Sequence, residues 1–237
     1  MQVAIVALAL QLTLAPLLLG GVFAWSMVWI TIGALICLAL SAVAARRIWT
    51  GPAPLVGWAA IAMLGWTALQ TAPLPCALVQ AVAPEAAKNT QLVRKLLDQP
   101  AAGSCTLSRD PGATTEEIVK GAAIVATLLA AWVISSLGAR RDVLWCVAGS
   151  TLIVSALALG HGLARLDAVY GMYRPVHAAR GILLGPLMNP NNLGAFAALG
   201  APLWISLSYA SPHREVRWLG FAATVVTCTA ALLSLSS

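Results

Sequence analysis

The sequence predicts an all-α membrane protein, a polytopic bundle of about seven transmembrane helices with two longer outward loops. Hydrophobic residues make up 60% of the 237-residue chain and charged residues only 9%, and the mean hydropathy is +0.86. A soluble domain of this length needs far more charge to cover its surface. Several apolar runs reach roughly 20 residues, the length at which a helix crosses a membrane with its backbone polar groups satisfied internally.

Seven apolar segments are predicted to span the membrane as one domain of residues 1–237, with approximate ranges 3–20, 22–44, 54–72, 116–138, 142–163, 193–211 and 216–236. Basic pairs follow the second, fourth and sixth segments: Arg46 and Arg47, Arg140 and Arg141, and Arg214 and Arg217. With seven spans these pairs lie on one side, and the positive-inside rule makes that side the cytoplasm. The N-terminus is therefore expected in the cytoplasm.

The first outward loop, residues 73–115, is expected to hold a short helix. Four of its apolar residues recur at helical spacing: Leu92, Val93, Leu96 and Leu97. With their charged neighbours they predict an amphipathic helix on the membrane surface. The sequence TTEE at residues 114–117 resembles a capping box, which would open the next span.

The five cysteines divide into two groups. Cys76 and Cys105 both lie in the first outward loop, where an oxidising periplasm permits a disulfide. They either form that disulfide or are two unrelated thiols. Cys37, Cys146 and Cys228 fall inside predicted spans and are expected to be buried as small apolar residues.

Metals, cofactors and nucleic acids are not expected. No C-x-x-C motif and no Cys/His ligand spacing is present, so no metal site is predicted. The net charge of +6 comes from arginines scattered among short loops rather than from a basic stripe with interleaved aromatics. Nucleic acid is therefore not an expected partner, and the basic residues report topology instead.

The second outward loop, residues 164–192, collects arginine, tyrosine and histidine. The guanidinium groups of Arg165, Arg174 and Arg180 can each hold phosphate oxygens in a bidentate fork. Such a cluster suits the diphosphate of a lipid-linked donor, or it pairs with anionic lipid or with an acidic neighbour. His177 lies among these residues and is the best histidine candidate for function, but no catalytic residue is assigned.

Three asparagines, Asn189, Asn191 and Asn192, stand around Pro190 directly before an apolar segment. An asparagine side chain at the N-cap accepts a hydrogen bond from the free N–H groups of a helix. Proline fits a turn just before a helix because its φ is fixed and it lacks an N–H. The cap needs one asparagine, most naturally Asn191 or Asn192. The surplus amides could bond sugar hydroxyls or a neighbouring loop, and composition does not choose between these.

Several stretches together resemble the O-antigen ligase and polymerase family of bacterial envelope proteins. They are LQTAPLPCALVQAVAP at residues 69–84, LSRDPGATTEEIVKGAAIVATLLAAW at residues 107–132, and LDAVYGMYRP followed by GPLMNPNNLGAF. The family's outward loop typically runs Gly-Pro-Phe-x-Asn-x-Asn-His and then enters a helix. Four residues match it: Gly185, Pro186, Asn189 and Asn191. Leu187 and Asn192 stand where phenylalanine and histidine are common.

The resemblance implies a glycosyltransferase of the bacterial inner (cytoplasmic) membrane that acts in lipopolysaccharide biosynthesis. Its donor would be a lipid-linked oligosaccharide on undecaprenyl diphosphate, and its acceptor a hydroxyl of lipid A-core, a glycan or a protein. No cofactor is implied. Arg180, together with Arg174, would contact the diphosphate, and the asparagines and His177 would shape the loop or bind substrate.

The resemblance covers nearly all of the chain but only the N-terminal half of a family member. It implies a truncated or split member, in which a second chain would supply the C-terminal half and its histidine base. Ligase and polymerase are built alike at this level. The alternative is a non-catalytic membrane transport or scaffold component of envelope polysaccharide assembly, although the predicted spans hold almost no ionisable residue for coupled transport.

Overall fold

Helices make up most of the computed structural model, which describes residues 1–46, 55–98, 100, 103–173, 183 and 185–235. The long helices are α1 (Gln2–Leu17), α2 (Ala24–Ala45), α3 (Leu55–Leu69), α6 (Pro111–Ile134), α7 (Arg140–Leu163), α8 (Pro190–Tyr209) and α9 (Arg214–Leu235). The short elements are the 3-10 turn η1 (Leu19–Gly21), β1 (Leu74–Pro75), α4 (Cys76–Val82), α5 (Pro84–Leu96), β2 (Ser104–Cys105) and the π-helical turn η2 (Ser135–Ala139). The all-α fold class is confirmed.

Each predicted span coincides with one long helix, with its ends shifted by a few residues. Within the described residues, three stretches are both long and apolar enough to cross a membrane: Ala24–Ala45, Pro111–Leu163 and Arg214–Ser234. The apolar helices α1 and α3 are shorter. The chain is therefore an all-α membrane protein, while the number of seven spans stays a prediction.

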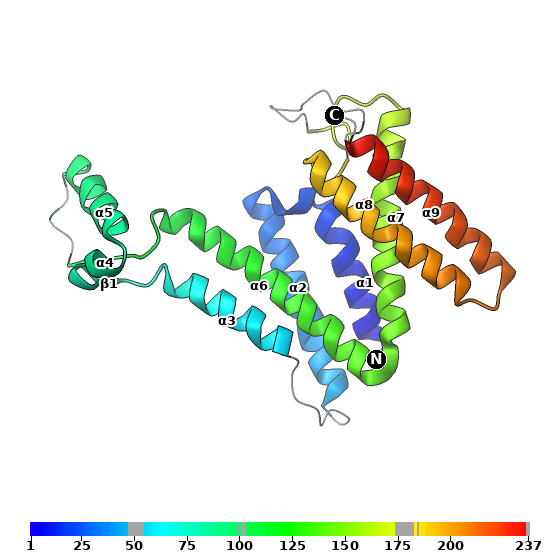
Figure 1. The fold of residues 1–237 in the computed structure, drawn as a ribbon, viewed down its shortest axis with the longest axis horizontal. Coiled ribbons are helices and arrows are strands. Elements are labelled where there is room, and N and C mark those ends of the chain that lie inside the picture. Colours follow the sequence, from blue (N-terminus) through cyan, green and yellow to red (C-terminus); the bar gives the residue numbers. More distant parts are fainter. Residues whose placement is uncertain (47–54, 99, 101–102, 174–182, 184, 236–237) are drawn as a thin grey trace. The chain divides into compact units, whose positions relative to one another are not determined.

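The stretch Pro111–Leu163 consists of two helices rather than one. A straight helix of its 53 residues would measure about 80 Å, far more than the roughly 30 Å of membrane hydrocarbon. The turn η2 interrupts it at Gly138, whose φ is 93°. Glycine adopts this backbone conformation without the strain that a Cβ brings. Figure 1 shows the resulting sharp bend between α6 and α7.

The chain folds as two compact units. Unit 1 comprises Met1–Thr50 and Ala126–Ser237, and unit 2 comprises Gly51–Val125. In unit 1, α1 and α2 run antiparallel. The Gln11 amide nitrogen on α1 donates to the Ile30 carbonyl at 3.0 Å, and Leu8 shares a buried cluster with Cys37.

Helices α1 and α7 run parallel, and one of their contacts repairs a defect in α1. Pro16 has no N–H, so the carbonyl of Leu12 four residues earlier loses its helical partner. The Ser150 hydroxyl on α7 donates to that carbonyl at 2.6 Å. Earlier on both helices, the Cys146 thiol lies 3.8 Å from the Ile5 carbonyl oxygen, to which it donates. In lipid such a partner matters because water cannot replace it.

Helix α8 runs antiparallel to α7. The indole N–H of Trp204 donates to the Ala148 carbonyl at 3.0 Å, and Leu193 at the start of α8 packs in a cluster with Ala158. Both members of each pair are buried. Later residues of α8 therefore meet earlier residues of α7.

Helices α8 and α9 approach closely, because small residues line their contact. Ala197 and Ala230 pack in one buried cluster. A Cβ added to Gly200 would lie 2.8 Å from the Cβ of Thr151 on α7 and 3.0 Å from Cγ2 of Thr227 on α9. Small residues at such positions allow the close backbone approach that is typical of membrane helices.

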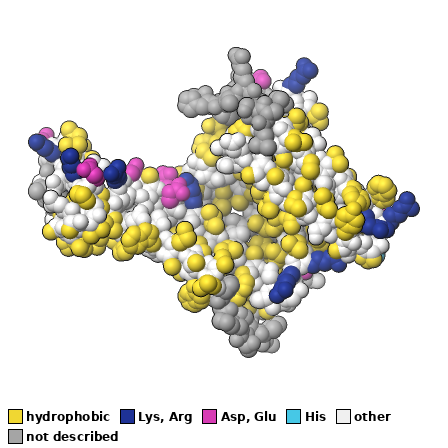
Figure 2. Space-filling view, viewed as in Figure 1, with side chains coloured by type: hydrophobic (Ala, Val, Ile, Leu, Met, Phe, Trp, Pro, Cys, Tyr) yellow, Lys and Arg dark blue, Asp and Glu magenta, His cyan; other side chains and the backbone are white. Residues whose placement is uncertain are grey.

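These helix directions place the described arginines of unit 1, apart from Arg165 after α7, at one end. Met1, Arg46 at the end of α2, Arg140 at the start of α7 and Arg214 at the start of α9 share it, whereas Arg47 lies outside the described residues. The ends of α1 and α7, and the start of α8, lie at the other (Figure 1). Figure 2 shows basic side chains at the α6–α7 bend and at the turn between α8 and α9.

In unit 2, helices α3 and α6 pack together, and the loop that joins them is closed by pairing between its two ends. A Cβ added to Gly121 on α6 would lie 3.0 Å from Cδ1 of Leu64 on α3, so these helices are in contact. Beyond their ends, the Ser108 N–H donates to the Gln70 carbonyl at 2.9 Å. Strands β1 and β2 then pair antiparallel. The chain thus leaves α3 and returns to α6 at the same end of the pair.

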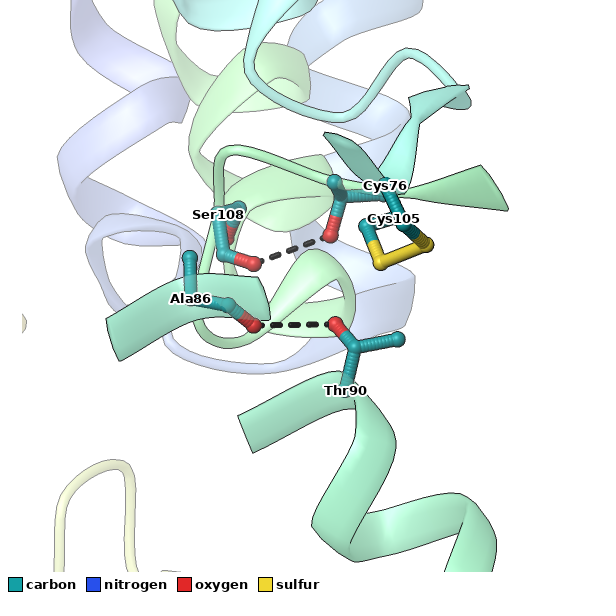
Figure 3. The surroundings of a disulfide bond; sticks show 6 residues. Cys76, Ala86, Thr90, Cys105 and Ser108 are labelled. Atoms are coloured by element: carbon teal, nitrogen blue, oxygen red, sulfur yellow. Dashed lines mark hydrogen bonds between the residues drawn. A yellow bond between two sulfur atoms is a disulfide. The ribbon is translucent and has the colours of Figure 1, made fainter. Parts of the chain in front are cut away.

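A disulfide joins Cys76, the first residue of α4, to Cys105 within β2 (Figure 3). Cys105 is buried in a small cluster with Val79 of α4 and with Ala86 and Ala87 of α5. In the same view the Thr90 hydroxyl donates to the Ala86 carbonyl, four residues back on α5, at 3.0 Å. The loop therefore has a small core of its own.

The helix in this loop is confirmed as α5. Its apolar residues Leu92, Val93 and Leu96, and Leu97 at its C-cap, are all more than half exposed. The predicted burial of Cys228 is wrong, since this thiol is exposed, whereas Cys37 and Cys146 are buried as expected.

The capping box predicted at residues 114–117 is wrong. Helix α6 begins earlier, at Pro111, and the Asp110 carboxylate accepts the Ala113 N–H at 3.0 Å. Thr114 already lies within the first turn, where its hydroxyl donates to the Asp110 carbonyl. Glu117 pairs with Lys120 at 2.6 Å instead of turning back toward the N-terminus.

Candidate functional site

The candidate site is the connection between α7 and α8, which closes the end of unit 1 opposite Met1 and the arginines that begin α7 and α9. Two parts of it are described, residues 164–173 and residues 183 and 185–189. Arg174, His177 and Arg180 lie outside the described residues. The site is therefore built from the turn after α7 and from the GPLMNPNN segment.

The turn after α7 is held by Tyr170. Its hydroxyl donates to the Leu17 carbonyl at the end of α1 at 2.7 Å, which satisfies one of the free carbonyls of that helix end. Burial raises the pKa of Tyr170, so the hydroxyl keeps its proton at neutral pH. Val169 is fully buried and bridges to Tyr173. Together these contacts fix the start of the outward connection on the helix bundle.

His161, in the last turn of α7, holds this turn through a hydrogen bond. Its side chain is only 7% exposed, and its Nε2 accepts the Tyr170 N–H at 3.4 Å. A neutral ring that accepts through Nε2 carries its proton on Nδ1. Nδ1 is buried without a hydrogen-bond partner in the part of the chain that the structure describes. Because the basic nitrogen is occupied, His161 positions the turn and is not assigned as a base.

The GPLMNPNN segment is packed down onto the helices. A Cβ on Gly185 would lie 2.9 Å from Cδ2 of Leu193 and 3.1 Å from the Cβ of Ala158, so a side chain has no room there. Pro186 is fully buried. Leu187 packs against the same cluster, which its apolar side chain suits as phenylalanine would. Packing thus accounts for Gly185, Pro186 and Leu187 in this segment.

Asn189 caps α8, which corrects the choice of Asn191 or Asn192. Its side-chain oxygen accepts the Asn191 N–H at 2.9 Å, and Pro190 is the first residue of the helix. The sequence pattern misplaced the cap because it counted the helix from the first apolar residue, Leu193. Proline is favoured at the first helical position, where the missing N–H costs nothing.

Asn191 and Asn192 are consequently free of the capping role. Both residues are exposed on the first turn of α8. Within the described residues no hydrogen bond engages either side-chain amide, whereas the Asn189 oxygen is already taken. An amide offers two donors and one acceptor, which matches the hydroxyls of a sugar. The site therefore presents two unused amides at the N-terminal end of a helix.

Asn189→Ala is expected to destabilise the protein by about 1 kcal/mol, because α8 loses its N-cap. The free energy of unfolding, measured by titration with denaturing detergent in mixed micelles, reports the change. Asn192→Ala is the matched control and should leave it unaltered, since this side chain caps nothing. An equal loss in both variants would contradict the assignment of the cap.

Charges and metal ligands at this end are few. Arg165 is exposed and forms no ion pair with any described residue. Across the described ranges no group of three or more His, Cys, Asp or Glu side chains gathers as a metal site would. Among the described residues of this connection, the Arg165 guanidinium and the amides of Asn191 and Asn192 are thus available to a ligand.

Tyr170 is the residue that sequence reasoning missed. It belongs to the stretch LDAVYGMYRP that resembles the envelope family, but no pattern marked its hydroxyl as the tie to α1. The contact joins residues 153 positions apart, which a reading of local sequence does not capture.

The fold and the site define an all-α membrane protein with a packed connection capping one end of its helices. No protein family, no curated protein and no solved structure matches the chain.

Proposed function

We propose that the chain is a membrane glycosyltransferase of the O-antigen ligase or polymerase type. It would transfer a glycan from an undecaprenyl-diphosphate-linked donor to an acceptor hydroxyl. The observation that carries the proposal is the GPLMNPNN segment, where packing accounts for Gly185 and Pro186, capping accounts for Asn189, and two exposed amides remain. The resemblance of the surrounding stretches to that family supports it.

The direction of the helices supports the topology in this proposal. The N-terminus and the described arginines of unit 1 other than Arg165 share one end, and the candidate site, which includes Arg165, lies at the other. The positive-inside rule then puts the basic end in the cytoplasm and the site on the outer side. The proposal accordingly has seven spans in a bacterial inner membrane, with a cytoplasmic N-terminus.

The chemistry assigned to the site is displacement at the anomeric carbon of the glycan. The bond from this carbon to the acceptor oxygen forms, and the bond to the diphosphate oxygen breaks. Arg180 and Arg174 are proposed to stabilise the charge that develops on the leaving diphosphate. Asn191 and Asn192 are proposed to bind hydroxyls of the glycan. A general base takes the acceptor proton, and no residue of this chain is assigned to that role.

Donor binding by the purified full chain tests these roles. Undecaprenyl diphosphate with and without a glycan is titrated in detergent micelles, and bound lipid is counted by native mass spectrometry. Arg180→Ala is expected to weaken both lipids by about tenfold or more, because a charge-assisted contact to phosphate is lost. Asn191→Ala combined with Asn192→Ala should weaken only the glycan-bearing lipid.

Arg217→Ala at the basic end is the control and should bind both lipids like the wild type. Together with a chain that supplies the C-terminal half, the wild type should then restore glycan transfer to cells that lack the cognate ligase or polymerase. Failure of the wild type to bind either lipid, or an equal loss in Arg217→Ala, would overturn the proposal. A non-catalytic transport or scaffold role would then take its place.

A further inference from the structure

Unit 2 contains a cavity that the proposed function does not use. Its volume is about 330 Å³, and it lies between α5, β2 and the segment that leads into α6. Thr90 and Cys105, both labelled in Figure 3, are in its wall, so the disulfide helps to shape it. The volume falls at the lower end of the range for small-molecule sites, roughly 300–1,000 Å³.

The described residues that line the cavity include two arginines and no acidic residue. Arg94 comes from α5 and Arg109 from the segment before α6. Neither forms an ion pair with a described residue. The nearest acid in sequence, Asp110, is engaged as the cap of α6. Two permanent positive charges thus line one small cavity, and neither is paired with a described acidic side chain, which favours an anionic ligand.

Neutral hydrogen-bond donors add to this preference. The Asn89 amide and the Ser104 hydroxyl also line the cavity, and neither has a hydrogen bond to the described part of the chain. Guanidinium, amide and hydroxyl groups all donate to phosphate oxygens, and the guanidinium fork matches two of them at once. The donor set therefore fits a phosphate group.

The position of the cavity indicates what carries this phosphate. Its wall includes Pro73, four residues after the end of α3, and Pro111, the first residue of α6. Both helices are apolar, and the side chains of Leu55 and Met63 on α3 are 84% and 72% exposed. Hydrocarbon that covers these helices would end close to the cavity, at the depth of lipid headgroups.

The exposed apolar residues of α5 also indicate a lipid as the ligand. Leu96 lies four residues after Leu92 and three residues after Val93, and all three side chains are more than half exposed. Val93 also lines the cavity. Figure 2 shows hydrophobic side chains beside the basic ones at the end of unit 2 that carries α5. An apolar strip next to a basic cavity is the arrangement of an interfacial helix on an anionic membrane.

We propose that this cavity binds the phosphate of an anionic phospholipid, such as phosphatidylglycerol. Arg94 and Arg109 hold the phosphate oxygens, and Asn89 and Ser104 complete the contact. The acyl chains lie along the apolar surface of α3 and α6, with the apolar strip of α5 in the interface. The site tethers the disulfide-bonded loop to the membrane, and it stands independently of the proposed glycan transfer.

Native mass spectrometry of the purified full chain, titrated with phosphatidylglycerol, tests the site. Arg94→Gln with Arg109→Gln should weaken the tightest bound lipid by about tenfold or more, as expected for lost charge-assisted contacts. Lys95→Gln is the matched control, because Lys95 neighbours Arg94 on α5 but does not line the cavity. It should bind lipid within about twofold of the wild type.

Two further measurements complete the test. The first distinguishes a lipid phosphate from free phosphate as the ligand, and the second detects variants that fail to fold. Millimolar inorganic phosphate should leave the lipid bound, and displacement by phosphate alone would show a free-anion site and overturn the lipid assignment. Thiol alkylation should show the Cys76–Cys105 disulfide intact in every variant. Lipid binding unchanged in the double arginine variant, or lost equally in Lys95→Gln, would refute the cavity as the site.

Discussion

Replacing both Cys76 and Cys105 with serine is expected to open the first outward loop. The disulfide spans a separation of 29 residues, and closing a loop of that length restricts the unfolded chain by about 3–4 kcal/mol. The loop has only a small core around Val79 and Ala87 to offset this loss. Hydrogen exchange in residues 77–98 should therefore rise by about two orders of magnitude, in the range where local opening limits it.

Cys228→Ser is the control for this prediction, because Cys228 is an exposed free thiol outside the loop. It should exchange like the wild type throughout. Exchange in α3 and α6 below the loop should also stay slow, since those helices contact one another at Leu64 and Gly121. Unchanged exchange in residues 77–98 would mean that the small core holds the loop without the disulfide.

Gly200→Ala is expected to destabilise unit 1 by about 1–3 kcal/mol, because the site is already filled. The new methyl group would meet Thr151 on α7 and Thr227 on α9, at 2.8 Å and 3.0 Å from the nearest carbon atoms. Both threonines are buried and hydrogen-bonded to their own helices, so neither can withdraw freely. Denaturant titration in mixed micelles measures the loss.

Gly149→Ala provides a control of opposite sign. Gly149 lies inside α7, and nothing lies within 4 Å of a Cβ built there. Alanine is a better helix former than glycine by roughly 0.5–1 kcal/mol, so this variant should be as stable as the wild type or slightly more stable. If both variants lost stability alike, the close contact at Gly200 would not be the cause.

The helices could be predicted from the sequence, whereas their ends could not. An apolar run fixes where a membrane helix lies, because the hydrocarbon accepts little else. The exact start of the helix depends instead on which of several neighbouring polar residues acts as its N-cap. Asp110 precedes a proline that fits the first helical position, so Asp110 caps α6 and the later TTEE sequence does not. Asn189, rather than Asn191 or Asn192, caps α8 for the same reason, because Pro190 follows it.

The candidate site could be located from the sequence, but its contacts could not. The asparagines and their position before a helix were visible in the pattern NPNN. The anchoring of the loop depends on Tyr170 reaching Leu17, and on His161 accepting a backbone N–H. The basic cavity likewise brings together Arg94 and Arg109 through strand pairing and a disulfide. Such meetings follow from tertiary structure rather than from local spacing.

The proline in α1 has a consequence for how the chain is made. The carbonyl of Leu12 is satisfied by a hydroxyl that lies 138 residues later, on Ser150. At a synthesis rate of about 5–20 residues per second, α1 leaves the ribosome roughly 7–28 s before its partner exists. During that interval α1 carries an unpaired carbonyl, which hydrocarbon cannot satisfy. Helix α1 therefore reaches its final membrane environment only when α7 arrives, so the order of synthesis is not the order of assembly.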